Sequence, residues 1–183
     1  MHRTHLIALA LAATLAATIA VAPAAAAAHV APAKATVAPA SAVRASTLAV
    51  PKFIFHAGLA FGAFHHFIYL PFKAGKFTSG SFLSKIKNYV EAGAAAVFVF
   101  HETKLALQDA QQNKALKTLV APLTNVIALL NTVVSKVKGH SLDAATMSTA
   151  ETQVGSIESL AKGAGSPISE AIPTAKQLLA GSA

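Results

Sequence analysis

The sequence predicts an all-α protein, an up-and-down helical bundle of about four helices that follows a signal peptide and a flexible Ala/Pro-rich linker. Three observations carry this prediction. Apolar residues recur at helical spacing along several segments, no segment alternates as a strand would, and short turns containing Gly or Pro separate the helices. The predicted divisions are a signal peptide (1–28), a linker (29–50), a helical bundle (51–163) and a short C-terminal helix or frayed tail (164–183).

The N-terminal segment has the three-part layout of a secretory signal peptide. One arginine precedes the apolar stretch from Leu6 to Val21, and small residues follow, with the preferred cleavage after Ala28. Cleavage after Ala24 or Ala33, and an uncleaved anchor, are the alternatives. We therefore expect a secreted or extracellular protein that associates with the cell envelope.

The stretch from Phe53 to Phe72 is uncharged for twenty residues between Lys52 and Lys73. The linker before it, residues 29–50, has no periodic apolar pattern and is expected to be flexible. A helix over 52–70 would be apolar on nearly every side and would end at Pro71. Its histidines favour the centre of a soluble bundle, since a histidine inside a membrane is costly, and a membrane-inserted helix 52–72 stays as the alternative.

Three further segments show helical patterns. Ser81 is the predicted N-cap of a helix over about 82–112. The apolar side of that helix is predicted to contain Ile86, Tyr89, Val90, Gly93, Val97, Phe100 and Leu107. The next helix has a heptad seam formed by Leu116, Val120, Leu123, Ile127, Leu130, Val134 and Val137, and Pro122 either starts a helix there or kinks a continuous one.

The last predicted long helix covers about 142–162, with Ser141 as its cap and Gly163 at its end. Its seam is Met147, Ala150, Val154, Ile157 and either Leu160 or Ala161. Ser166 and Pro167 are expected to open a short helix, or Pro173 to restart one. Earlier in the chain, Gly58 and Gly62 are expected to allow close helix packing, against the alanines at 92–96 or in a lipid-phase dimer.

The motifs that carry common enzymatic chemistry are absent from the sequence. It contains no phosphate-binding loop, no G-x-S-x-G nucleophile elbow and no cysteine, which also excludes thiolate metal sites and iron–sulfur clusters. We expect no enzyme activity and no cofactor. The strongest candidates for a metal or haem site are His65, His66, His101 and Glu102, but no pair among His56, His65, His66 and His101 has the i, i+3 or i, i+4 spacing of helical ligands.

The charge distribution is the feature that points to a partner. Residues 29–90 contain seven cations and no acid, whereas the rest of the chain from Glu91 has seven lysines and seven acids. Anionic-surface binding is assigned to Lys73, Lys76, Lys85 and Lys87, interleaved with Phe72, Phe77 and Phe82. Lysine attracts an anionic surface and phenylalanine can bury at its apolar boundary.

The predicted function is that of a non-enzymatic, envelope-associated or interaction protein. Its expected partners are anionic lipid or cell-wall polymer, with another helical protein or a second copy as further candidates and no nucleic acid. The alternatives are a membrane-active protein that uses helix 52–72, and a metal or haem carrier that uses His65, His66 and His101. Lysines that only keep an apolar segment soluble are the plainer interpretation of the charge.

Overall fold

The structure, a computed structural model, describes residues 40–180, with side chains from residue 48 onward. This part of the chain contains helices and turns and no strand, so the all-α prediction is confirmed. The predicted signal peptide and residues 29–39 of the predicted linker lie outside the described residues.

The first helix, α1 (Ala40–Phe64), begins earlier than predicted. The second half of the predicted linker, residues 40–50, is helical, so the prediction of a flexible chain is wrong there. This segment contains Ala, Arg and Leu, which favour helix, and no glycine. Pro51 lies inside α1 with its ring exposed.

The helix also passes the position where it was predicted to stop. A π-helical turn, η1 (His65–Tyr69), follows α1 and leads into α2 (Leu70–Lys73), which contains Pro71. The N–H of Leu70 donates to the carbonyl of His65, five residues back. Such a widened turn gives the proline ring room that a regular α-turn lacks, so Pro71 does not end the helix.

Helix α3 (Phe82–Gln112) has the predicted bounds, and the Ser81 hydroxyl accepts from the Ser84 N–H as the predicted N-cap. Its buried face differs from the predicted one. The residues buried there are mostly small, namely Ala92, Ala95, Ala96, Phe98, Val99, Glu102, Thr103, Ala106, Asp109 and Ala110. Small side chains let α1 approach closely, so they occupy the interface in place of Ile86 and Val90, which are exposed.

A short 3₁₀ turn, η2 (Lys114–Leu116), precedes α4 (Lys117–Lys138), which runs through Pro122 without interruption. Four of the seven predicted seam residues are buried, namely Leu116, Leu123, Leu130 and Val137. At the other three places the buried residue is one position earlier than predicted, at Leu119, Val126 and Val133. Both choices fit a heptad spacing, and only the position of the neighbouring helices selects between them.

Helix α5 (Ala144–Gly163) is capped by Asp143, whose carboxylate accepts from the Thr146 N–H at 2.8 Å, and not by Ser141. The Lys136 ammonium lies 2.6 Å from this carboxylate, and the two contacts lower the pKa of Asp143 to about 2. The predicted seam of α5 is buried, with Ala161 in place of Leu160 at its end.

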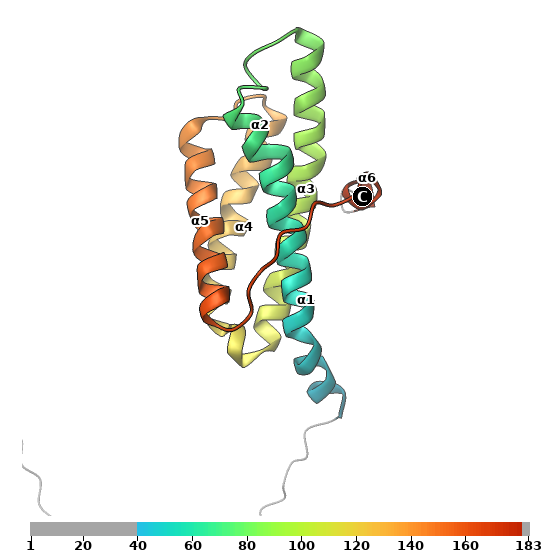
Figure 1. Ribbon diagram of the computed structural model, residues 1–183, viewed down its shortest axis with the longest axis vertical. Coiled ribbons are helices and arrows are strands. Elements are labelled where there is room, and N and C mark those ends of the chain that lie inside the picture. Colours follow the sequence, from blue (N-terminus) through green and yellow to red (C-terminus); the bar gives the residue numbers. More distant parts are fainter. Residues whose placement is uncertain (1–39, 181–183) are drawn as a thin grey trace, which may run out of the picture. The chain divides into compact units, whose positions relative to one another are not determined.

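The C-terminal segment, residues 164–174, has no helix, and α6 (Ala175–Ala180) follows it. The prediction that a helix opens at Ser166–Pro167 is therefore wrong, whereas the alternative, a helix that restarts at Pro173, agrees with α6. This segment crosses α1 before α6 reaches α3 (Figure 1). The Ala171 N–H donates to the Gly58 carbonyl at 3.0 Å, which ties the segment to α1.

The core forms where consecutive long helices pack, α1 on α3, α3 on α4 and α4 on α5 (Figure 1). Its largest fully buried side chains include Phe53, Phe61, Phe64 and Ile68 from α1 and η1, Leu116, Leu119 and Leu123 from η2 and α4, and Met147 and Ile157 from α5. Two stretches of the described chain, Leu48–Lys73 and Lys114–Lys138, are long and apolar enough to cross a membrane by length and composition alone.

Candidate functional site

The four predicted lysines lie along one stretch of structure, from the end of α2 through the turn 74–81 into the first turns of α3. Lys73, Lys76 and Lys87 are exposed and Lys85 is half-exposed. The Lys73 ammonium lies 5.5 Å from the centre of the Tyr69 ring. Lys87 lies 3.8 Å from Glu91 one turn later, an exposed pair that contributes little to stability.

The three phenylalanines predicted to act with these lysines have different environments. Phe77 is 4% exposed and packs on Tyr89, with ring centres 4.8 Å apart. Phe72 is half-buried against the core. Only Phe82, which is 73% exposed, is available to an external partner.

Four exposed apolar side chains on the first turns of α3 form a surface that we call the α3 stripe, namely Phe82, Leu83, Ile86 and Val90. Their exposed fractions are 73%, 76%, 39% and 66%. In a helix of 3.6 residues per turn these positions fall within an arc of about 100°. The stripe is the largest departure from the sequence-based prediction, which placed Ile86 and Val90 in the core and did not select Leu83.

Lysines border the α3 stripe on both sides. Around the helix, Lys85 lies about 60° before Phe82 and Lys87 lies about 40° after Leu83, so the apolar arc is between two cations. Phe82, Lys85 and Ile86 also line a shallow cavity of about 230 Å³ with Tyr89 and His140. An apolar arc with basic borders is the pattern of helices that lie in a membrane interface.

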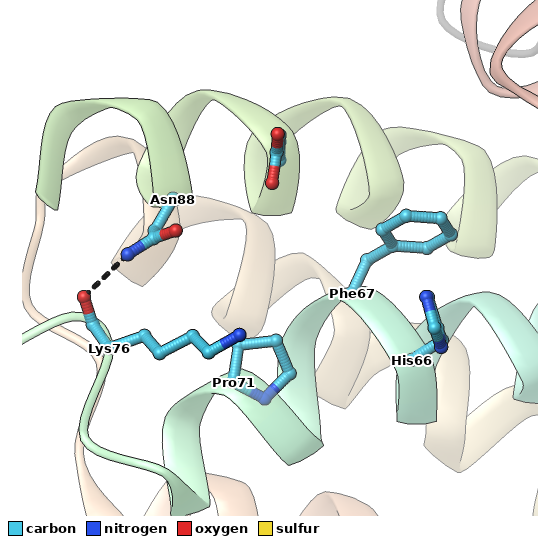
Figure 2. A pocket seen from close by; sticks show the side chains of 6 residues that line it. His66, Phe67, Pro71, Lys76 and Asn88 are labelled. Carbon is cyan, nitrogen blue, oxygen red and sulfur yellow. Dashed lines mark hydrogen bonds between the residues drawn. The ribbon is translucent and has the colours of Figure 1, made fainter. Parts of the chain in front are cut away.

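A polar pocket adjoins this region, between the end of η1 and α3. Its volume is about 140 Å³, and it is lined by His66, Phe67, Pro71, Lys76, Asn88 and Glu91. Figure 2 shows the Lys76 side chain extending along Pro71 into the pocket. The Asn88 amide donates to the Lys76 carbonyl at 2.7 Å and fixes the backbone at this point (Figure 2).

The histidines are not brought together as a metal site would require. His65 is half-buried and Glu102 is buried, but each has a different partner. His66 and His101 are exposed. Among residues 40–180, no group of three or more His, Cys, Asp or Glu side chains is placed to hold a metal ion.

His56 and His65 each face two carboxylates instead. His56 Nδ1 lies 2.6 Å from Glu102, and its Nε2 lies 4.0 Å from Asp109. His65 Nε2 lies 2.7 Å from Glu151 on α5, and its Nδ1 bonds Glu170 in the C-terminal segment. The sequence could not reveal these pairs, because their members are 46 to 105 residues apart.

Burial and neighbouring charge shift the pKa of several of these groups. Burial alone would lower the pKa of His65, but the bonds and charges of Glu151 and Glu170 raise it above its ordinary value. Burial raises the pKa of Glu158, and the nearby Glu170 adds to this. Burial also raises the pKa of Asp109, although His56 and Lys52 partly oppose that shift.

Comparison with known protein families, curated proteins and solved structures finds no match to this chain.

Proposed function

We propose that this chain is a secreted, non-enzymatic protein, an up-and-down helical bundle that attaches to anionic lipid surfaces of the cell envelope. The observation that carries the proposal is the α3 stripe, an exposed apolar arc bordered by Lys85 and Lys87. Lys73 and Lys76 add two further exposed cations on the adjoining turn.

Charge and apolar burial make separate contributions to this attachment. A lysine near an anionic membrane contributes about 1 kcal/mol, so four give weak binding that salt can screen. The stripe adds apolar area, at about 25 cal/mol per Å² removed from water. A dissolved wall polymer offers charge but no apolar phase, so the exposed Phe82 and Leu83 favour lipid over polymer.

The large apolar side chains of α1 are buried inside the protein, which supports attachment at the surface rather than insertion of this helix. Phe53, Phe61 and Phe64 of α1 are at most 1% exposed, because α3 and other parts of the same chain cover them. Insertion of helix 52–72, the alternative considered from the sequence, would require these contacts to be broken.

The test is flotation of the purified chain with vesicles that contain phosphatidylglycerol. Binding is expected at low salt and should largely vanish at about 0.5 M salt, where the screening length is a few ångströms. Replacing Lys73, Lys76, Lys85 and Lys87 with Gln should abolish it. The matched control replaces four exposed lysines elsewhere, Lys114, Lys117, Lys138 and Lys162, and changes the net charge by the same amount.

A second pair of variants separates lipid from polymer. Phe82→Ser combined with Leu83→Ser should lose vesicle flotation but keep any binding to a soluble polyanion such as polyphosphate. The proposal would be contradicted if both four-lysine variants lost vesicle flotation equally. It would also be contradicted if the Phe82→Ser, Leu83→Ser variant floated fully with the vesicles. Flotation that resists high salt would favour insertion of the apolar helix.

A further inference from the structure

An apolar groove lies between α3, α6 and η1, next to the polar pocket. Its volume is about 320 Å³, within the roughly 300–1,000 Å³ of typical ligand sites. The apolar residues that line it are Phe67 from η1, Val90 and Ala94 from α3, and Ala175, Leu178 and Leu179 from α6. Glu91 is the single charged residue in its wall.

The groove and the polar pocket adjoin each other, because Phe67 and Glu91 line both. The groove is apolar, and the adjoining pocket is polar, with Lys76 and Asn88 on one side and His66 on the other, beside Phe67 (Figure 2). The Asn88 amide is already used on the Lys76 carbonyl. This leaves the ammonium of Lys76 and the ring of His66 as the groups that face a ligand.

The charge at the polar end favours an anion. Within residues 40–180, the Lys76 ammonium has no carboxylate within 4.0 Å, and the His66 ring makes no hydrogen bond. Glu91 would repel an anion, but Lys87 lies 3.8 Å from it and offsets its charge. The polar end thus holds two available donors beside a carboxylate that already has a cationic neighbour.

We propose that this combined site binds a single-chain amphiphile, with the acyl chain in the groove and an anionic headgroup at Lys76 and His66. A wholly apolar ligand would leave the Lys76 ammonium beside it without a partner, and a small anion would leave the groove unfilled. The site takes one molecule from solution and so goes beyond attachment to a membrane surface, although both involve Lys76 and Val90.

The test is titration of the full chain with monomeric palmitate, below the concentration at which it aggregates, followed by calorimetry. Saturable binding of one palmitate per chain is expected, and palmitate methyl ester should bind more weakly because it lacks the charge. Ala94→Leu should fill the groove and weaken binding by at least about tenfold, which corresponds to about 1.4 kcal/mol. Ala128→Leu, at an exposed position on α4, is the matched control.

Lys76→Gln provides a second variant, and its exposed position makes it safe for folding. It should remove the preference for palmitate over the methyl ester while leaving the ester's affinity unchanged. Comparing lysophosphatidylglycerol with palmitate distinguishes a phosphate headgroup from a carboxylate. Comparing it with lysophosphatidylcholine distinguishes a net negative headgroup from a zwitterionic one. No saturable binding of any of these single-chain anions, or equal affinities for Ala94→Leu and Ala128→Leu, would overturn the proposal.

The outcome is separable from that of surface attachment. Ala94→Leu should leave vesicle flotation unchanged, because Ala94 lies outside the α3 stripe. Vesicle flotation without monomer binding would overturn only the amphiphile site, and monomer binding without flotation would overturn only the surface attachment.

Discussion

Gly58 and Gly62 stand one turn apart on α1, and the backbone of the C-terminal segment passes directly over both. A Cβ at Gly58 would collide with the carbonyl oxygen of Ser169, and one at Gly62 would collide with the backbone of Ala171. The sequence pattern correctly indicates close packing, but the partner is an extended segment rather than the alanines at 92–96. The motif specifies only that a neighbour approaches closely, and it contains no information about which neighbour.

Gly62→Ala should therefore destabilise the protein, by about 1–3 kcal/mol, since three backbone atoms of Ala171 would have to move. The control is Gly155→Ala on α5, where nothing lies within 4 Å of the added carbon. That change should stabilise the helix by about 0.5–1 kcal/mol. Urea unfolding measures both, and equal effects of the two changes would show that the C-terminal segment does not rest on α1.

At the scale of elements, the C-terminal segment (164–174) forms no helix and so has no regular backbone hydrogen bonds of its own. Two backbone hydrogen bonds hold it: the Ala171 N–H donates to the Gly58 carbonyl, and the Ser166 N–H donates to the Ala161 carbonyl at 2.9 Å. A side-chain hydrogen bond between Glu170 and His65 is the third contact. His65 also bonds Glu151, so one imidazole links α5 and the C-terminal segment to the start of η1. Glu158 lies close to Glu170, and the Tyr69 ring packs against His65 at 5.9 Å.

This link predicts how stability depends on pH. The pKa of His65 is raised above 6.5, so its contribution to stability is fully present below about pH 6.5 and is lost as the pH rises through the folded-state pKa. Above that pKa a neutral imidazole no longer offsets the carboxylates of Glu151 and Glu170. His65→Gln should therefore lower the free energy of unfolding most at about pH 6 and progressively less by about pH 8.5.

The control for this prediction is His66→Gln, the adjacent exposed histidine, which should change stability little at any pH. Urea unfolding of both variants and the parent across this range provides the measurement. A His65→Gln effect that is independent of pH, or that grows as the pH rises, would show that the imidazole does not act as a charged link.

The elements themselves were predictable to the extent that local chemistry determines them. The bounds of α3 and its Ser81 cap follow from local signals, and so does the buried seam of α5. The choice between Val126 and Ile127 in α4 does not, because either fits the heptad and only neighbouring helices decide. The start of α1 and the π-helical turn before Pro71 were not predicted. An alanine-rich segment can be helical or extended, and a proline can end a helix or be accommodated within it.

For the whole molecule, the lysines were visible in the sequence and the α3 stripe was not. The lysines can be counted along the sequence. The exposure of Phe82, Leu83 and Val90, in contrast, depends on which face of α3 packs against α1, and this is the face that carries the alanines. The histidine pairs were hidden for the same reason, since their carboxylates come from distant parts of the chain. Residues that act alone or in a run were predictable, and those that act through tertiary contact were not.

The most direct test of surface attachment places a fluorophore in the α3 stripe. The chain contains no tryptophan, so Phe82→Trp introduces the sole indole, and Leu160→Trp on α5, at a 41% exposed position outside the stripe, is the control. Phosphatidylglycerol vesicles at low salt should shift the emission of Trp at position 82 to shorter wavelength, because the ring enters the acyl boundary. Emission at position 160 should not change. No shift at position 82, or equal shifts at both positions, would contradict attachment through the α3 stripe.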